Sequence, residues 1–174
     1  MKKQSILLLL TFVFTLSSSV LMAQSKYDAK LFEAVEKGSA KMIQKYVEKG
    51  ANVNTLDYME NTPLILAIMH DEMNVAKELI EQGADVNHVN SNNNTPLTIA
   101  VVLDRFEAVD MLLNEGVDPN YHGKNGQTAL HVAASRGNYR SLISLISFGV
   151  DINAQSDDGT TALMCAASRG HENI

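Results

Sequence analysis

Apolar residues recur along the chain at the three- and four-residue spacing of an α-helix, in short stretches separated by polar turns. Each stretch puts its apolar side chains on one stripe and its polar side chains on the other faces. The clearest sets are Ile43, Tyr46 and Val47; Ala76, Leu79 and Ile80; Val109, Leu112 and Leu113; and Leu142, Leu145 and Ile146. A short helix cannot cover such a stripe alone, so the pattern predicts helices that stack on their neighbours.

The same pattern returns with a period of 33 residues. Five residue types keep this interval independently, and such self-similarity is the signature of a repeat architecture. Two of the columns are Leu31, Leu64, Leu97, Leu130 and Leu163, and Ala34, Ala67, Ala100, Ala133 and Ala166. The period predicts an N-terminal capping unit at 24–56, full units at 57–89, 90–122 and 123–155, and an incomplete unit at 156–174.

Each unit is predicted to hold two short helices, from the residues at the helix ends. Thr62-Pro63 opens a first helix, because Thr is a good N-cap and Pro fits the first helical position. Gly137 suits the left-handed conformation of a helix stop. Asp71 and Asp104 occupy that position in the middle units. The left-handed conformation costs Asp more free energy than it costs Gly. Gly-Ala-Asp-Val-Asn at 83–87 predicts the turn into an extended hairpin.

The segment Gly-Gln-Thr-Ala-Leu-His-Val-Ala-Ala-Ser-Arg-Gly at 126–137 resembles the ankyrin repeat. Thr95-Pro96-Leu97 and the segment 83–87 resemble other signature segments of that family. The resemblance covers residues 27–174. It implies an all-α repeat solenoid of stacked helix-turn-helix units with connecting β-hairpin loops. It also implies a protein-binding scaffold, since the family has no common enzymatic activity.

Three departures from the repeat pattern carry structural expectations. Glu60 and Asn93 replace the hairpin glycine of the later units, so we expect the tip of the second unit to bend differently. Residues 26–54 lack the hairpin and the Thr-Pro start, as expected of a capping unit. The fifth unit stops at Ile174, where its second helix should begin, and this favours a fragment over an end that is frayed or paired.

The first 23 residues form a separate unit. Lys2 and Lys3 are followed by the apolar run 6–16, three serines, and a small residue, Ala23. This order predicts a secretory signal peptide cleaved after Ala23, and hence a periplasmic or secreted protein. A retained membrane anchor is the alternative, but a bilayer span needs roughly 20 apolar residues and the run is about half as long.

Composition and charge narrow the class of partner. The chain has 174 residues, of which 45% are hydrophobic and 20% charged, as in globular proteins and unlike disordered ones. Removal of residues 1–23 would leave 12 basic and 20 acidic residues, a formal charge of −8. A nucleic acid partner usually requires a basic face, so this balance argues against nucleic acid and against anionic lipid.

Residues able to support catalysis are sparse. The single cysteine, Cys165, lies in an apolar helical segment and is interpreted as a buried small hydrophobe. His131 fills the repeat's own Thr-x-Leu-His position and is expected to hydrogen-bond between units, and His171 is assigned to a structural turn. His88 and His122 are 34 residues apart, with no further ligands placed to complete a metal site. We predict no enzyme, no cofactor and no metal; a hydrolase using carboxylates is the weak alternative.

Partner specificity in a scaffold must lie at positions that the repeat does not need for stacking. These are the hairpin tips and the residues that close each inner helix, which together line the concave face. Exposed apolar groups there indicate an interaction surface, and Tyr and Arg commonly anchor partners. The predicted partner-binding residues are Tyr58, Met59, Met69, His70, Val102, Leu103, Lys124, Arg136 and Arg169. For Val102 and Leu103, packing against the hairpin is the alternative.

We therefore expect an exported scaffold that binds a protein partner through its concave face and hairpin tips. An accessory or protective protein for an exported envelope enzyme is the alternative.

Replacing Tyr58 by Ala or Leu103 by Asp should weaken partner binding by about 1–3 kcal/mol, the range of interface anchors. The fold should be unaffected, because neither side chain belongs to the repeated core positions. Titration of the partner against each variant measures the loss. Unchanged affinity in both variants would remove this patch from the interface.

Overall fold

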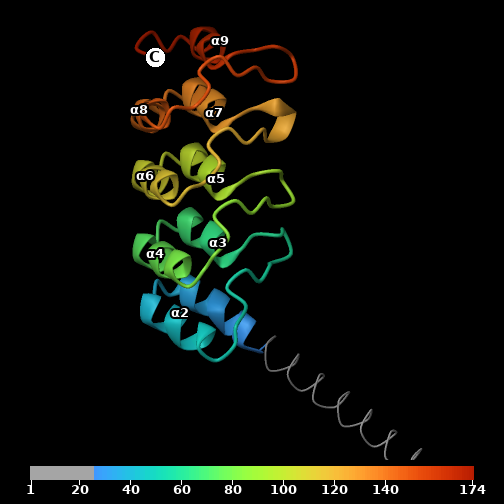
Figure 1. The fold of residues 1–174 in the computed structure, drawn as a ribbon, viewed down its shortest axis with the longest axis vertical. Helices are drawn as coiled ribbons and strands as arrows, with labels where there is room; N and C mark the ends of the chain where they lie inside the picture. Colours follow the sequence, from blue (N-terminus) through green and yellow to red (C-terminus); the bar gives the residue numbers. More distant parts are fainter. Residues whose placement is uncertain (1–25) are drawn as a thin grey trace, which may run out of the picture.

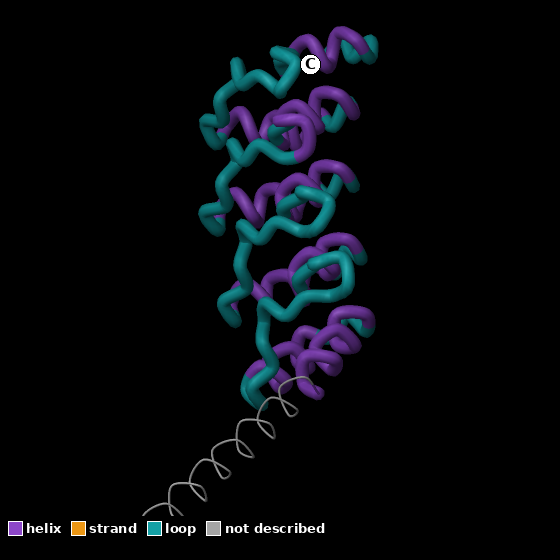
Figure 2. Tube along the Cα trace, turned by 90° about the vertical axis from the view of Figure 1, so that its right-hand side faces the viewer, coloured by secondary structure: helices purple, strands orange, loops and turns teal. Residues whose placement is uncertain are grey.

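The computed structural model describes residues 26–174; the predicted signal peptide lies outside the described residues. The described chain forms an elongated column of stacked helical units, with a loop projecting to the same side from each successive unit (Figure 1). Figure 2 shows the same column turned by 90°, with the connecting loops gathered along one edge. The predicted all-α repeat solenoid is confirmed. The loops contain no strand in the described residues, and only an isolated antiparallel bridge joins Gln155 to Thr161.

Helices in the column form an inner and an outer row. Residues 26–36 are helical and open the capping unit. The inner helices are α3 (Pro63–Met69), α5 (Pro96–Val102), α7 (Ala129–Arg136) and α9 (Ala162–Ser168), each packed on the next. The outer helices are α2 (Ala40–Val47), α4 (Met73–Glu81), α6 (Phe106–Asn114) and α8 (Tyr139–Ser147). No helix within residues 26–174 has the length and apolar character needed to cross a bilayer.

The predicted helix ends are confirmed. The Thr62 hydroxyl accepts a hydrogen bond from the Ile65 amide at 3.3 Å, which satisfies one of the free amides of the first turn of α3. Gly137 closes α7 in the left-handed conformation, with φ +74°. Asp71 and Asp104 adopt the same conformation, with φ +64° and +56°. The aspartates therefore carry a backbone strain that glycine avoids.

The predicted difference at the second unit's hairpin tip was wrong. Glu60 and Asn93 adopt left-handed φ values of 59° and 60°, close to the 80° of Gly159 in the fifth unit. The Glu60 amide donates to the Asp57 carbonyl at 3.1 Å, which closes the same turn as in the later hairpins. The Asp57 carboxylate also accepts from the Met59 amide at 2.8 Å. These hydrogen bonds hold a non-glycine residue in the left-handed region.

The hairpin that does differ belongs to the fourth unit. Its tip is a 3-10 turn, η1 (Lys124–Gly126), in which Asn125 and Gly126 are both left-handed, with φ 58° and 69°. Asn tolerates this conformation better than most residues. A Cβ added to Gly126 would clash with the carboxylate of Asp157 in the next hairpin. Glycine therefore allows the fourth and fifth hairpins to approach closely.

An asparagine in each linking turn joins one unit to the next. The Asn54 side-chain oxygen accepts a hydrogen bond from the Asp85 amide at 2.8 Å, one repeat further along the chain. Such an amide satisfies a turn N–H that no helix can satisfy. The same bond recurs from Asp118 to Asn87 (2.8 Å) and from Asp151 to Asn120 (3.1 Å). The period of the asparagines is thus the period of these inter-unit bonds.

His131 links two units from inside the core, as predicted. The ring is fully buried, and its Nδ1 accepts from the Thr128 amide at 3.2 Å. Its Nε2 lies 3.0 Å from the carbonyl oxygen of Thr160 in the next unit. Because Nδ1 accepts, Nε2 carries the proton and donates to Thr160. The ring therefore fixes the helix start and the neighbouring hairpin together.

The leucine column is buried at every unit except the last. Leu31, Leu64 and Leu97 are at most 1% exposed, and Leu130 is 4% exposed. Leu163, in the same column, is 67% exposed. The physical reason is that this position faces the following unit, and among residues 26–174 no helix lies beyond α9. Ala166, in the other column, is 1% exposed because α7 covers it.

Replacing His131 by Ala should lower the free energy of unfolding by about 2–4 kcal/mol, because it opens a cavity and strips Thr128 and Thr160 of a buried partner. His70→Ala is the matched control: its ring is exposed and the loss should stay within about 0.5 kcal/mol. Urea denaturation of both variants measures the difference. Equal stability of the two would show that the buried ring does not connect the units.

Candidate binding groove

The concave face is walled by hairpins that neighbouring units hold in place. Within the fourth hairpin the Gly123 amide donates to the Gln127 carbonyl at 2.9 Å. Its tip is tied to the fifth hairpin by a hydrogen bond of 3.1 Å from the Asp157 amide to the Asn125 carbonyl. In the third unit, Asn93 accepts from the Tyr121 hydroxyl at 2.8 Å. Side chains on these hairpins are thus set on a fixed frame above the inner helices.

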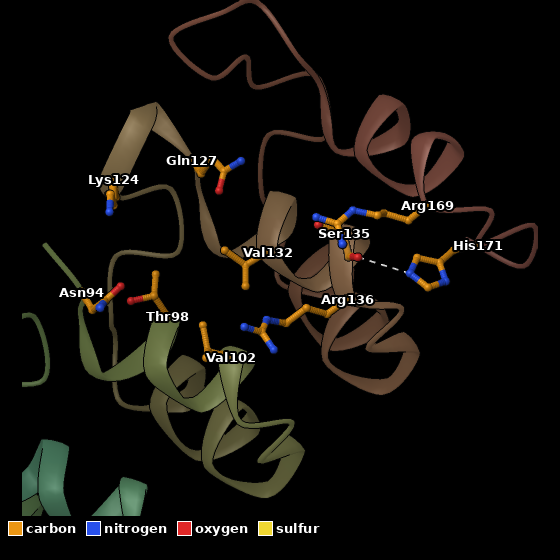
Figure 3. Close-up of a pocket in the computed structure, with 11 residues that line it drawn as sticks. Asn94, Thr98, Val102, Lys124, Gln127, Val132, Ser135, Arg136, Arg169 and His171 are labelled. Atoms are coloured by element: carbon orange, nitrogen blue, oxygen red, sulfur yellow. Dashed lines mark hydrogen bonds between the residues drawn. The ribbon is translucent and has the colours of Figure 1, made fainter. Parts of the chain in front are cut away.

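A groove of about 690 Å³ lies on this face, between the third and fifth units. Its walls come from two inner helices, two hairpins and the chain that follows α9, and Figure 3 shows their side chains. Helix α5 contributes Thr98 and Val102, and α7 contributes Val132, Ser135 and Arg136. The hairpins contribute Asn94, Gly123, Lys124 and Gln127, and the chain after α9 contributes Arg169 and His171.

The groove carries positive charge and no acidic side chain. Lys124, Arg136 and Arg169 line it, and none of its lining residues is Asp or Glu. In Figure 3 the Arg136 side chain extends from the end of α7 toward Val102 on α5. The Arg169 side chain reaches back from the end of α9 over Ser135. The two guanidinium groups therefore face one recess from successive units.

Comparison with known families settles what kind of chain this is. The family described as ankyrin repeats (3 copies) matches residues 31–123 and again 115–174. The chain belongs to the ankyrin-repeat family. No curated protein matches it. Ankyrin repeats generally mediate protein–protein interactions and are typically non-enzymatic scaffolds.

Four of the predicted partner-binding residues line the groove of this ankyrin solenoid. They are Val102, Lys124, Arg136 and Arg169. Arg136 and Arg169 are one repeat apart, and stacking brings residues one repeat apart onto the same face. Val102 is half-buried, with its side chain directed into the recess (Figure 3). Their role in binding remains a prediction.

The other five predicted residues lie outside the groove, on the second and third ankyrin units. Tyr58 stands at a hairpin tip with 94% of its surface exposed, and Met59 next to it is half-buried. Met69 and Leu103 end the inner helices α3 and α5 and are 44% and 41% exposed, and His70 is exposed beside Met69. Their binding role also remains a prediction.

Sequence analysis missed several groove residues, and helical spacing could have found two of them. Thr98 and Val132 lie four residues before Val102 and Arg136, which puts them one turn back on the same helix face. His171 was assigned a structural role, and its Nε2 does lie 3.2 Å from the Ser135 carbonyl oxygen. It also lines the groove, and only the stacking of the ankyrin units could reveal this.

Two titratable side chains elsewhere in the ankyrin units, Cys165 and Asp158, have pKa values shifted by their structural surroundings. Cys165 is 8% exposed, and burial raises the pKa of its thiol, as the interpretation of a buried hydrophobe requires. Hydrogen bonds from Thr160 and Ser156 hold the pKa of Asp158 at about 2, below its usual 3.8. No group of three potential metal ligands occurs in the part of the chain that the structure describes. The polar groups of the groove can donate hydrogen bonds and offer positive charge.

Proposed function

We propose that this protein is an exported scaffold that binds a protein partner along the groove between the third and fifth ankyrin units. One observation carries the proposal. Three cationic side chains line one recess, and none of them forms an ion pair within residues 26–174. A scaffold needs such positions, because a partner can only be selected by groups that the fold leaves available.

The hydrogen bonds of the groove support this reading. Within residues 26–174 the side chains of Asn94, Gln127 and Ser135 have no hydrogen-bond partner, although their backbones do. The hydroxyl of Thr98, by contrast, is used up by the cap of α5. Amide and hydroxyl groups on a fixed frame can pair with the backbone of an extended segment at small entropic cost. Val102 and Val132 offer apolar contact beneath them.

Export is the second part of the proposal and rests on the amino-acid order of residues 1–23. Expression of the full chain in a secreting host, followed by intact-mass measurement of the exported protein, tests it. We expect a mass that corresponds to a chain beginning at Gln24. A full-length chain that stays with the membrane would instead support a retained anchor.

Photo-crosslinking from chosen positions should locate the partner. A photoreactive residue at Val132, inside the groove, and others at Tyr58 and Leu103 should trap a protein from an envelope extract. The same residue at Lys77, exposed on the outer helix α4, is the control and should trap little. The products are identified by mass spectrometry. Equal labelling from Val132 and Lys77 would contradict binding on the concave face.

A further inference from the structure

Positive charge is unevenly distributed along the chain. Residues 57–174 carry 16 acidic and six basic side chains, so most of the solenoid is strongly acidic. Three of those six cations, Lys124, Arg136 and Arg169, nevertheless line one groove that has no acidic lining. On a surface with this excess of acid, such a concentration of cations creates a local field opposite to that of the whole molecule.

No carboxylate within residues 26–174 forms an ion pair with these three side chains. The ion pairs within residues 26–174 are Lys37–Glu33 and Arg105–Asp71, and neither involves the groove. Another cation of the same region, Arg140, is occupied in stacking on the Phe106 ring, 4.6 Å from its centre. The charge of the groove is therefore available to a ligand.

From this arrangement we infer that the groove binds an acidic segment of the partner, one whose Asp or Glu carboxylates pair with Arg136 and Arg169. The inference rests on the proposed function and names its ligand chemistry. Guanidinium groups pair with carboxylates through two parallel hydrogen bonds, which gives direction as well as attraction. The free amides of Asn94 and Gln127 would then bind the backbone of the segment.

A short acidic peptide suits the groove better than a long polyanion. A nucleic acid gains affinity by neutralising many phosphates in a row, and this groove offers three cations only. Beyond its hairpin wall stands Asp157, which lies against Gly126 at the tip. A chain of continuous negative charge would meet this carboxylate and the acidic surface around it. A segment with a few carboxylates would not.

Fluorescence anisotropy with two labelled peptides tests the inference: one alternates Glu and Ser, and the other has Gln in place of every Glu. The Glu/Ser peptide should bind, and the Gln/Ser peptide should bind at least about tenfold more weakly. The reason is that only carboxylates form ion pairs with the guanidinium groups. Added salt should weaken the Glu/Ser complex, since the groove is open to solvent. Equal binding of the two peptides, or no binding of either, would overturn the inference.

Substitutions locate the binding. The double variant Arg136→Gln/Arg169→Gln should lose about tenfold or more in affinity for the Glu/Ser peptide. Lys77→Gln/Arg140→Gln removes the same charge from the outer helices and should change the affinity by less than about twofold. Urea denaturation of the groove variant should match the parent, which excludes a loss of fold. Equal losses of peptide affinity in the two double variants would show that the effect depends on total charge and not on the groove, and would contradict the proposal.

A single-stranded oligonucleotide and heparin are the competing ligands. If either displaced the Glu/Ser peptide at physiological salt and depended on Arg136 and Arg169, the groove would be a polyanion site and the inference would be wrong. If the acidic peptide did not bind but a partner crosslinked to Val132, the proposed scaffold function would stand and the acidic ligand would be rejected. Failure of crosslinking from Val132, with the peptide still bound, would reject the partner site in the groove.

Discussion

The contact between the apolar face of one unit and the next unit is the constraint on which the whole structure depends. Each unit is a pair of short helices that would expose its leucines if it stood alone. Leu64 and Leu97 lie one repeat apart and are both out of solvent. Asparagine bonds of the same period, such as that of Asn87, and the single bond from His131 to the next unit fix how the faces meet. Apolar burial supplies the free energy, and the polar pairs set the register.

Because stacking uses these positions, side chains elsewhere, including those on the concave face, are free to differ from unit to unit. The residues that close the inner helices show this best: along the column, His70 and Leu103 give way to Arg136 and Arg169. The face thus changes from mixed and apolar in the second and third units to cationic in the fourth and fifth. The 33-residue period and the direct packing of α9 on α7 bring the two arginines to one recess. A regular core therefore supports a binding surface whose side-chain chemistry changes along the column.

The sequence predicts the features that are set by local residue type or that recur with the repeat. The cap at Thr62 and the left-handed stop at Asp71 follow from residue type and position alone. It gave no sign of the exposure of Leu163, because a column of identical residues says nothing about whether a following unit covers the last member. For the groove, Arg136 and Arg169 could be chosen from the repeat, whereas His171 could not. Its place in the wall depends on the geometry between units, which no single repeat encodes.

Truncation of the same leucine in two units tests most directly whether neighbouring units cover each other. Leu97 is 1% exposed and Leu163 is 67% exposed, although both occupy the same position of the repeat. Urea denaturation should show that Leu97→Ala loses about 2–5 kcal/mol of unfolding free energy, as buried leucines do. Leu163→Ala should lose less than about 1 kcal/mol. Similar losses from both variants would contradict the account.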